Sequence, residues 1–241
     1  KSWDPFFEYP LGATASDSYM QMCMGYNDEY PNDIGDSVVR AKIIEMLCRQ
    51  GNKNPFGQRR DETVTVEQVL ASRWIIAPFL RLLEACMYTE GAAGILFASE
   101  KKAREISERT GVPPIWVKGV GAANESYQVG RGGSHKPLHS IVSDRVAAER
   151  AYKMAGVKPS DIQLVELHDA FIAQFMITMG EMGFVPLGKT RKLVDDGIMA
   201  DIRELGDTKR PKKGQLLLNP SGGLIFGGHF VGGSNMFSMW S

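Results

Sequence analysis

Residues 214–230 read GQLLLNPSGGLIFGGHF. An apolar run that ends at Asn219 passes directly into a glycine-rich turn containing one histidine, His229. Glycine admits positive φ angles and lets the backbone lie close to a ligand, so the pairs Gly222–Gly223 and Gly227–Gly228 predict a strand followed by a turn that positions the imidazole. The alternative is an ordinary strand-to-helix turn in which His229 is a satisfied core residue.

The segments before this stretch alternate between apolar and amphipathic runs. Strands are predicted at 115–124 (IWVKGVGAAN) and 162–167 (IQLVEL), and helices at 140–157 and 169–184. Strand–helix–strand alternation indicates helices packed on a sheet, so the predicted fold class is α/β.

The first part of the chain has its own local signals. A helix is expected to start after Thr65, a buried strand is expected at 94–98 (GILFA), and a surface helix is expected to end at Gly111. The pair Pro113–Pro114 follows, and we place the main boundary there.

A second histidine occupies the same kind of position as His229. His168 follows the strand 162–167 and precedes a helix expected to open at Asp169. Strand ends that lead into helix N-termini form the usual binding crevice of an open α/β sheet. A neutral imidazole there can deprotonate a nucleophile or donate to a developing oxyanion. The alternative is a histidine beside a capping aspartate, and His135 and His139 are expected on the surface.

Composition excludes several classes of function. The 28 basic and 28 acidic residues give a net charge of zero, which argues against a nucleic-acid partner. No apolar run reaches the roughly 18 residues that span a bilayer. The three cysteines show no CxxC spacing, so no metal site is expected. Their odd number, without a secretory segment, favours a cytoplasmic protein.

Two motifs together resemble those of a known family. VELHDAF at 165–171 and NPSGGLIFGGHFVGG at 219–233 are similar to motifs of the thiolase superfamily, specifically the sterol-carrier-protein-x type and the related archaeal and bacterial acetyl-CoA acetyltransferases. The stretch 54–103 also resembles this subgroup, so the similarity extends from about Tyr26 to Asn235.

The resemblance implies a layered α-β-α-β-α thiolase fold made of two similar halves. Residues 1–111 would be a connecting region and the end of the N-terminal half, and residues 112–241 would be an incomplete C-terminal half.

The resemblance also implies residue roles. His229 would activate a nucleophilic cysteine, and His168 would sit in an oxyanion hole. Coenzyme A would be a substrate, with no cofactor bound covalently. The remaining residues expected to bind substrate or CoA are Thr89, Phe171, Asn219, Ser221, Gly222 and Gly223.

The chain departs from the family pattern in two ways. None of Cys23, Cys48 and Cys86 stands where the family has its nucleophile, so we expect this chain to be one part of a longer or split enzyme. Phe230 replaces the proline of the family's Gly-His-Pro, which suggests a bulky or aromatic acyl group such as that of benzoylsuccinyl-CoA.

Three functions remain open from the sequence. The first is a thiolase that cleaves or forms a 3-oxoacyl-CoA. The second is a thiolase-like retro-aldolase that acts on acyl-CoA, and the third is a non-catalytic subunit. The expected partners are CoA and acyl-CoA, a second copy in a homodimer, and a small zinc-ribbon/OB-fold protein. Aromatic residues at 3–9 and 236–240 are expected to need cover from further protein.

Overall fold

The computed structural model describes residues 10, 12, 14–124, 138–205 and 210–230. The terminal aromatic segments at 3–9 and 236–240, and His135, lie outside the described residues. The α-helices are α1 (Ala15–Glu29), α2 (Ser37–Gly51), α3 (Val66–Ala71), α4 (Glu100–Thr110), α5 (Val142–Ala155), α6 (Ile172–Glu181), α7 (Lys192–Asp195) and α8 (Gly223–Phe226). The strands are β1 (Trp74–Ile76), β2 (Leu80–Arg81), β3 (Leu164–Val165) and β4 (Leu217–Leu218). Short 3₁₀ helices within the described residues include η2 (Leu82–Glu84), η3 (Pro159–Asp161) and η4 (Ile202–Glu204).

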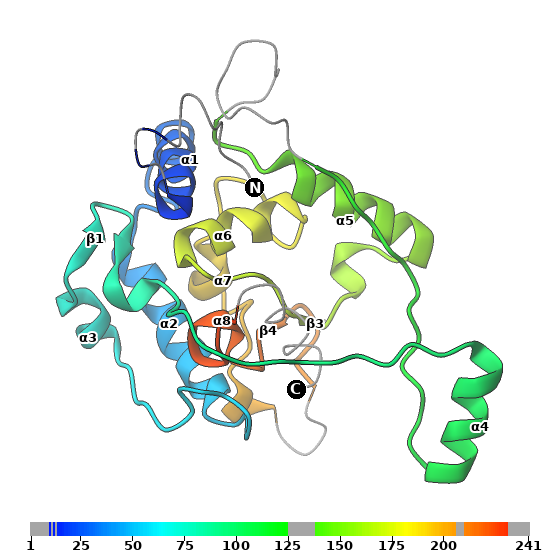
Figure 1. Ribbon diagram of the computed structural model, residues 1–241. Coiled ribbons are helices and arrows are strands. Elements are labelled where there is room, and N and C mark those ends of the chain that lie inside the picture. The colour runs from blue at the N-terminus through cyan, green and yellow to red at the C-terminus, as the bar shows by residue number, and fades with distance from the viewer. Residues whose placement is uncertain (1–9, 11, 13, 125–137, 206–209, 231–241) are drawn as a thin grey trace.

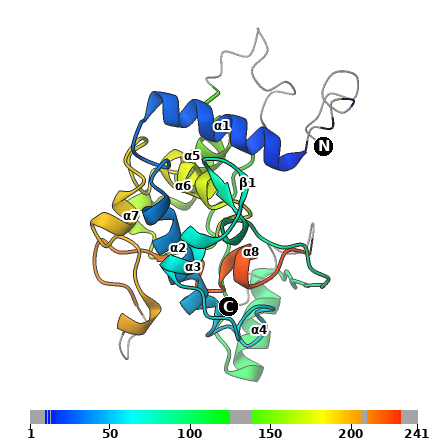
Figure 2. The same cartoon turned by 90° about the vertical axis from the view of Figure 1, so that its left-hand side faces the viewer.

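Helix α6 is the centre of the core. All ten of its residues are buried, and α1, α2 and α5 pack against it. Figure 2 shows α1 lying across the top of the molecule with α6 and α2 beneath it. Helix α2 also contacts α8, so the first and last parts of the described chain share one core. Among the described residues, no helix is both long and apolar enough to traverse a bilayer.

Local sequence signals explain where several helices begin and end. Thr65 caps α3 as expected, since its side chain accepts from the Gln68 amide while the Gln68 side chain accepts from the Thr65 amide. Helix α4 ends at Gly111 as expected, with φ of 73° in the left-handed region. Asp36 caps α2 through hydrogen bonds from the amides of Val38 and Val39.

The two strands predicted beside the histidine motifs form a parallel pair. β3 and β4 pair through Leu164 with Leu217 and Val165 with Leu218. They are shorter than the predicted runs 162–167 and 214–219. Since parallel strands end at the same edge of a sheet, the segments that follow β3 and β4 lie side by side. This pairing confirms the mixed α/β class and brings the two motifs together.

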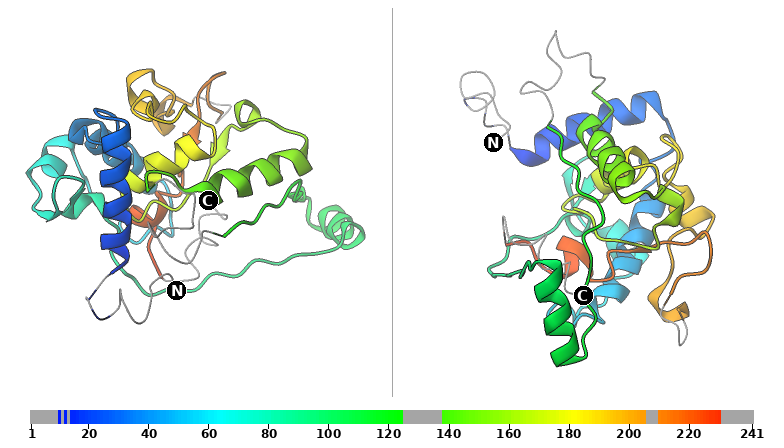
Figure 3. Two further views of the ribbon diagram at one scale, coloured as in Figure 1. Left: turned by 90° about the horizontal axis from the view of Figure 1, so that it is seen from above. Right: turned by 90° about the vertical axis from the view of Figure 1, so that its right-hand side faces the viewer.

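The two other predicted strands do not form. Segments 94–98 and 115–124 are extended but unpaired, and Leu96 and Ile115 are 84% and 94% exposed. No strand among the described residues lies beside them to complete a sheet. Segment 119–122 lies against α5 instead, where the Val120 amide contacts the Met154 sulfur. Figures 1 and 3 show α4 held away from the core by these two extended segments. The division into 1–111 and 112–241 stays a prediction.

A buried ion pair joins α2 to η2, the short helix that directly follows the β1–β2 hairpin. The Arg40 Nε donates to Glu84 at 2.7 Å, and both side chains are fully buried. The same guanidinium donates to the carbonyls of Ile34 and Pro78, and Glu84 accepts from the Arg81 amide. All the charged atoms of the pair therefore have partners, which is the condition under which a buried pair is tolerated.

Removing one member of this pair should destabilise the fold strongly. We expect Glu84→Ala to lower the free energy of unfolding by about 3–5 kcal/mol, because it leaves the Arg40 charge buried without its counter-ion. Glu100→Ala is the matched control, since it breaks an exposed pair with Arg104 on α4 and should cost no more than about 0.5 kcal/mol. Urea denaturation of both variants measures the difference. Equal losses would contradict this account of the hairpin.

Candidate functional site

One side chain joins the two motifs. The Asn219 Oδ1 accepts from the Leu167 amide at 2.8 Å, and the Asn219 Nδ2 donates to the Leu167 carbonyl at 3.0 Å. Asn219 is fully buried and has φ of 44°, a left-handed conformation that asparagine tolerates better than most residues. The chain therefore turns sharply after β4, while the Asn219 side chain continues the hydrogen bonding to the segment after β3.

Two carboxylates on either side of His168 complete this connection. Glu166 accepts from the Ser221 amide at 2.9 Å and from the Ser221 hydroxyl at 2.8 Å. Asp169 accepts from the Leu224 amide at 2.6 Å. With Asn219, these contacts fasten residues 166–169 to residues 219–224 and fix the backbone on which His168 lies.

Asp169 corrects one expectation. It does not open α6, since the N-cap residue is Phe171. Its carboxylate instead accepts a hydrogen bond from the Leu224 amide in α8. The sequence could not distinguish these two roles, because an acid placed before a helix fits either. Burial raises the pKa of Asp169 to about 7, although the hydrogen bond from Leu224 opposes the shift. Its Oδ2 has no hydrogen-bond partner among the described residues.

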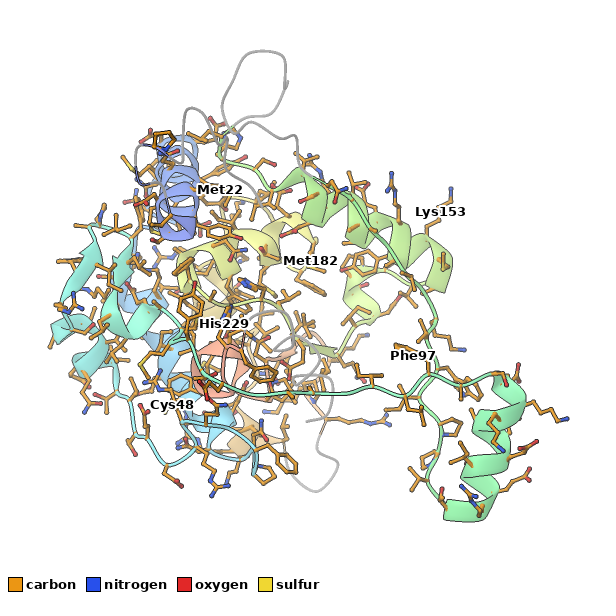
Figure 4. All side chains as sticks on the ribbon, viewed as in Figure 1. Met22, Cys48, Phe97, Lys153, Met182 and His229 are labelled. Atoms are coloured by element: carbon orange, nitrogen blue, oxygen red, sulfur yellow. The ribbon has the colours of Figure 1, made fainter. Side chains whose placement is uncertain are left out.

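The two histidines lie next to each other. The ring centroids of His168 and His229 are 6.0 Å apart with the planes at 79°. Figure 4 shows His229 near the middle of the molecule, at the level of α8. Burial lowers the pKa of His168, the nearby His229 lowers it further, and the side-chain amide of Gln174 partly opposes the shift. These surroundings therefore favour the neutral form of the His168 imidazole.

Segment 85–91 bridges the two histidine loops. The Cys86 amide donates to the Ala170 carbonyl at 2.9 Å, and the Thr89 amide donates to the His229 carbonyl at 3.0 Å. The exposed Tyr88 meets the His229 ring edge-on, with centroids 5.2 Å apart. The Thr89 hydroxyl and the His229 Nδ1 are buried and have no hydrogen-bond partner among the described residues.

The structure brings the predicted site residues into one region. Thr89 contacts His229, and Asn219 and Ser221 bond to the segment around His168. Phe171 pairs in antiparallel fashion with Ala85, and its ring lies 5.5 Å from that of Tyr19. The sequence reasoning missed Glu166, Asp169, Tyr88 and Gln174. One signal could have indicated Glu166. It is an acid at the end of a predicted strand, and a serine–glycine turn follows the other strand of the pair.

All three cysteines of the sequence lie within the described residues. Burial raises the pKa of the Cys23 thiol to about 12. Burial, with a contribution from Asp169, raises that of Cys86 to about 12 as well. Burial also raises the pKa of Cys48. Each is a neutral thiol at neutral pH, so none offers a thiolate to the histidine pair. Within the described residues, no three histidine, cysteine or acidic side chains are grouped to hold a metal ion.

Comparisons with known proteins identify related sequences. The family model described as thiolase C-terminal domain-like matches residues 134–240. Acetyl-CoA acetyltransferase of Methanocaldococcus jannaschii is 30% identical over 236 residues, which cover 98% of this chain and 54% of that protein. The C-terminal part of this chain is thiolase-like.

A further relative and a solved structure show how much of a longer protein this chain matches. Sterol carrier protein 2 of Bos taurus is 31% identical over 196 residues, which cover 81% of this chain and 33% of that protein. The chain thus spans about half of the archaeal relative and a third of the bovine one. The solved structure titled Ltp2-ChsH2(DUF35) aldolase has a TM-score of 0.71 and 21% identity, covering 96% of this chain and 56% of that chain. It shares the fold.

The thiolase-like turn after β4 requires glycine at position 223. Gly223 has φ of +62°, and a Cβ there would lie 1.9 Å from the Asp169 Oδ2. We expect Gly223→Ala to lower the free energy of unfolding by about 1–3 kcal/mol more than Gly197→Ala does. Gly197 has a similar φ of +64°, but a Cβ there would meet open space. Thermal unfolding of both variants separates crowding from backbone strain. Equal losses would show that the contact with Asp169 relaxes without cost.

The raised pKa of Asp169 makes a further prediction. The neutral carboxyl is favoured in the folded state, so its contribution to stability is complete below about pH 4 and is lost as the pH rises through about 7. Asp169→Asn keeps an oxygen for the Leu224 amide but does not titrate. The stability of the natural protein relative to this variant should therefore fall between pH 4 and 7, by at most about 4 kcal/mol. Urea denaturation across this range tests it, and parallel pH profiles would contradict it.

Proposed function

We propose that this chain supplies the two histidines of a thiolase active site, in which a 3-oxoacyl-CoA is cleaved by CoA or formed by Claisen condensation. The observation that carries the proposal is the His168–His229 pair, 6.0 Å between ring centroids, on adjacent loops of a parallel strand pair. The likeness of residues 134–240 to the thiolase C-terminal domain supports it.

In the proposed cleavage, a cysteine thiolate attacks the 3-oxo carbon and the bond between C2 and C3 breaks. The acyl group stays on sulfur as a thioester, and the electron pair goes to C2 as an enolate of acetyl-CoA, which takes up a proton. The thiolate of CoA then displaces the cysteine. His229 would remove the thiol protons, and His168 would stabilise the charge on the thioester oxygen.

The remaining predicted residues would shape the pocket. Asn219, Ser221, Gly222 and Gly223 would form its floor, because the turn brings backbone close to both imidazoles. Thr89 and Phe171 would contact the pantetheine arm of CoA. The partnerless Thr89 hydroxyl beside His229 supports this assignment, since a bound substrate would supply a hydrogen bond.

The proposal needs protein beyond these 241 residues. The nucleophilic thiolate would come from another part of the same polypeptide or from a partner, because burial holds all three cysteines of this chain as thiols. The exposed apolar segments 94–98 and 115–124 would pack on that protein. A homodimer and a small zinc-ribbon/OB-fold partner are part of the proposal, and the structural neighbour whose title names a DUF35 complex supports a partner of some kind.

A retro-aldolase is the second candidate. Such an enzyme breaks a C–C bond of an acyl-CoA without forming an acyl-cysteine, so it needs no thiolate. Two observations favour it: the neutral thiols, and the fold shared with a protein titled an aldolase. A non-catalytic subunit is the third candidate, and it requires neither histidine.

Histidine variants test the proposal. In the protein purified with any chain that accompanies it, His229→Ala and His168→Ala should each lower kcat/KM for acetoacetyl-CoA with CoA by about 10²–10⁴-fold, since each removes proton transfer or charge stabilisation. His139→Ala is the control, because its ring lies edge-on to Tyr30 and apart from the pair. Turnover is followed by loss of the 3-oxoacyl absorbance, with an aromatic 3-oxoacyl-CoA as a second substrate.

Intact mass separates the three candidates. A trapped acyl adduct after incubation with acyl-CoA, on this polypeptide or a partner, supports the thiolase. C–C cleavage that depends on both histidines but leaves no adduct supports the retro-aldolase. Unchanged turnover in both histidine variants would show that this chain is a non-catalytic subunit.

A further inference from the structure

The loop at 54–62, between α2 and α3, lies against α8 and the turn that leads to His229. Asn54 is buried, and its Nδ2 donates to the Ser221 carbonyl at 3.0 Å, just before α8 begins. Gln58 and Arg59 contact the other end of the same helix. The loop therefore spans α8 from one end to the other.

Three consecutive carbonyls at the end of α8 accept hydrogen bonds from this loop. The Arg59 Nη1 donates to the Ile225 carbonyl at 3.0 Å. The Arg59 amide donates to the Phe226 carbonyl at 3.0 Å, and the Gln58 amide donates to the Gly227 carbonyl at 3.1 Å. The last carbonyls of a helix have no partner within the helix itself. The loop therefore satisfies the end of α8 from outside.

The Arg59 side chain is held in one orientation. Its Nε and Nη2 donate to the two carboxylate oxygens of Glu62 at 2.8 and 2.6 Å, and its Cζ lies 4.8 Å from the centroid of the Phe226 ring. The side chain is only 9% exposed. A bidentate contact with a carboxylate fixes the plane of a guanidinium. The remaining nitrogen is thereby directed at the Ile225 carbonyl, so the end of α8 is tied to the loop.

The chain between α8 and His229 does not determine its own path. It consists of Gly227 and Gly228, and glycine restricts the backbone less than other residues do. Gly228 has φ of +128°, and a Cβ there would lie 3.0 Å from the Gln58 side chain and 3.2 Å from the Thr89 hydroxyl. Contacts on either side therefore impose the placement of His229: the loop before it, and Thr89 after it.

We infer that Arg59 is a positioning residue for His229. It holds the end of α8, so that the glycine pair starts from a fixed point. Gln58 supports this arrangement, because its Nε2 donates to the Glu90 carbonyl at 2.8 Å and so ties the segment that bonds to His229 to the same loop. The catalytic consequence rests on the proposed function, but the placement of the ring does not.

A role in general stability is the alternative for Arg59. A buried arginine that caps a helix stabilises the fold whatever the site does. Loss of stability alone lowers Tm, but it leaves the surroundings of His229 unchanged in the molecules that stay folded. A positioning role predicts a local change at His229 in the folded protein.

Histidine NMR separates these two roles. The chain has four histidines, so ¹³C-labelled imidazoles give few signals, and that of His229 is assigned from a His229→Gln variant. We expect Arg59→Ala to shift or broaden the His229 signal, because the glycine pair loses its fixed start. The His139 signal should not change, since that ring packs edge-on against Tyr30.

Arg60→Ala is the matched control. It removes the neighbouring arginine and the same charge, but the Arg60 side chain is half-exposed and donates to the Pro55 carbonyl within its own loop. We expect Arg60→Ala to leave the His229 signal unchanged. An equal change in Arg60→Ala would overturn the inference, and so would an unchanged His229 signal in folded Arg59→Ala.

If Arg59→Ala does not fold, Glu62→Ala decides in its place. The Glu62 side chain is 43% exposed, so the fold should tolerate its loss. The change removes both acceptors that orient the guanidinium, so it should shift or broaden the His229 signal as well. An unchanged signal would again contradict the positioning role.

Turnover supplies the second readout. In the protein purified with any chain that accompanies it, Arg59→Ala should lower kcat for acetoacetyl-CoA with CoA about 10–100-fold with KM nearly unchanged, because a misplaced imidazole slows proton transfer and leaves substrate contacts in place. A loss confined to KM would assign Arg59 to substrate binding and overturn the inference. If the natural protein shows no turnover, the proposed function fails, and the NMR experiment still tests the placement of His229.

Discussion

The two hydrogen bonds between the Asn219 side chain and the Leu167 backbone are the contact on which the site depends. Regular pairing of β3 with β4 ends at Val165 and Leu218. Beyond that point an amide side chain takes the place of a backbone partner and satisfies both polar groups of Leu167. The chain after β4 is thereby free to turn, while the chain after β3 stays fixed. His168 is the next residue, so its backbone position is fixed by the hydrogen bonds that the Asn219 side chain makes to Leu167.

The two acids that flank His168 differ in their environments. Both oxygens of Glu166 accept hydrogen bonds from Ser221, and the residue is only half-buried. Asp169 is fully buried, and one of its oxygens has no partner among the described residues. An unsatisfied buried oxygen costs free energy. The close approach of Gly223 to that oxygen shows that the turn is packed against the carboxyl with no room for a side chain.

The sequence allowed some of these features to be predicted and concealed others. The glycine pairs around His229 and the strand before His168 were readable because they are local patterns. The pairing of β3 with β4 was not predicted, because it joins segments that are distant in sequence. The predictions of strands at 94–98 and 115–124 were wrong. An apolar run indicates that a segment tends to be extended, but it does not show whether another strand lies beside it. The role of Asp169 was hidden, because its bond from the Leu224 amide joins segments that are distant in sequence.

The two imidazoles are held by different kinds of contact. His168 depends on a side chain, since Asn219 holds the backbone of the preceding residue, Leu167. His229 depends on backbone: its carbonyl accepts from the Thr89 amide, and it follows Gly228 at φ of +128°. The two rings are nevertheless coupled, because the nearby His229 lowers the pKa of His168. A change at the glycines that moves the second ring therefore also alters the basicity of the first.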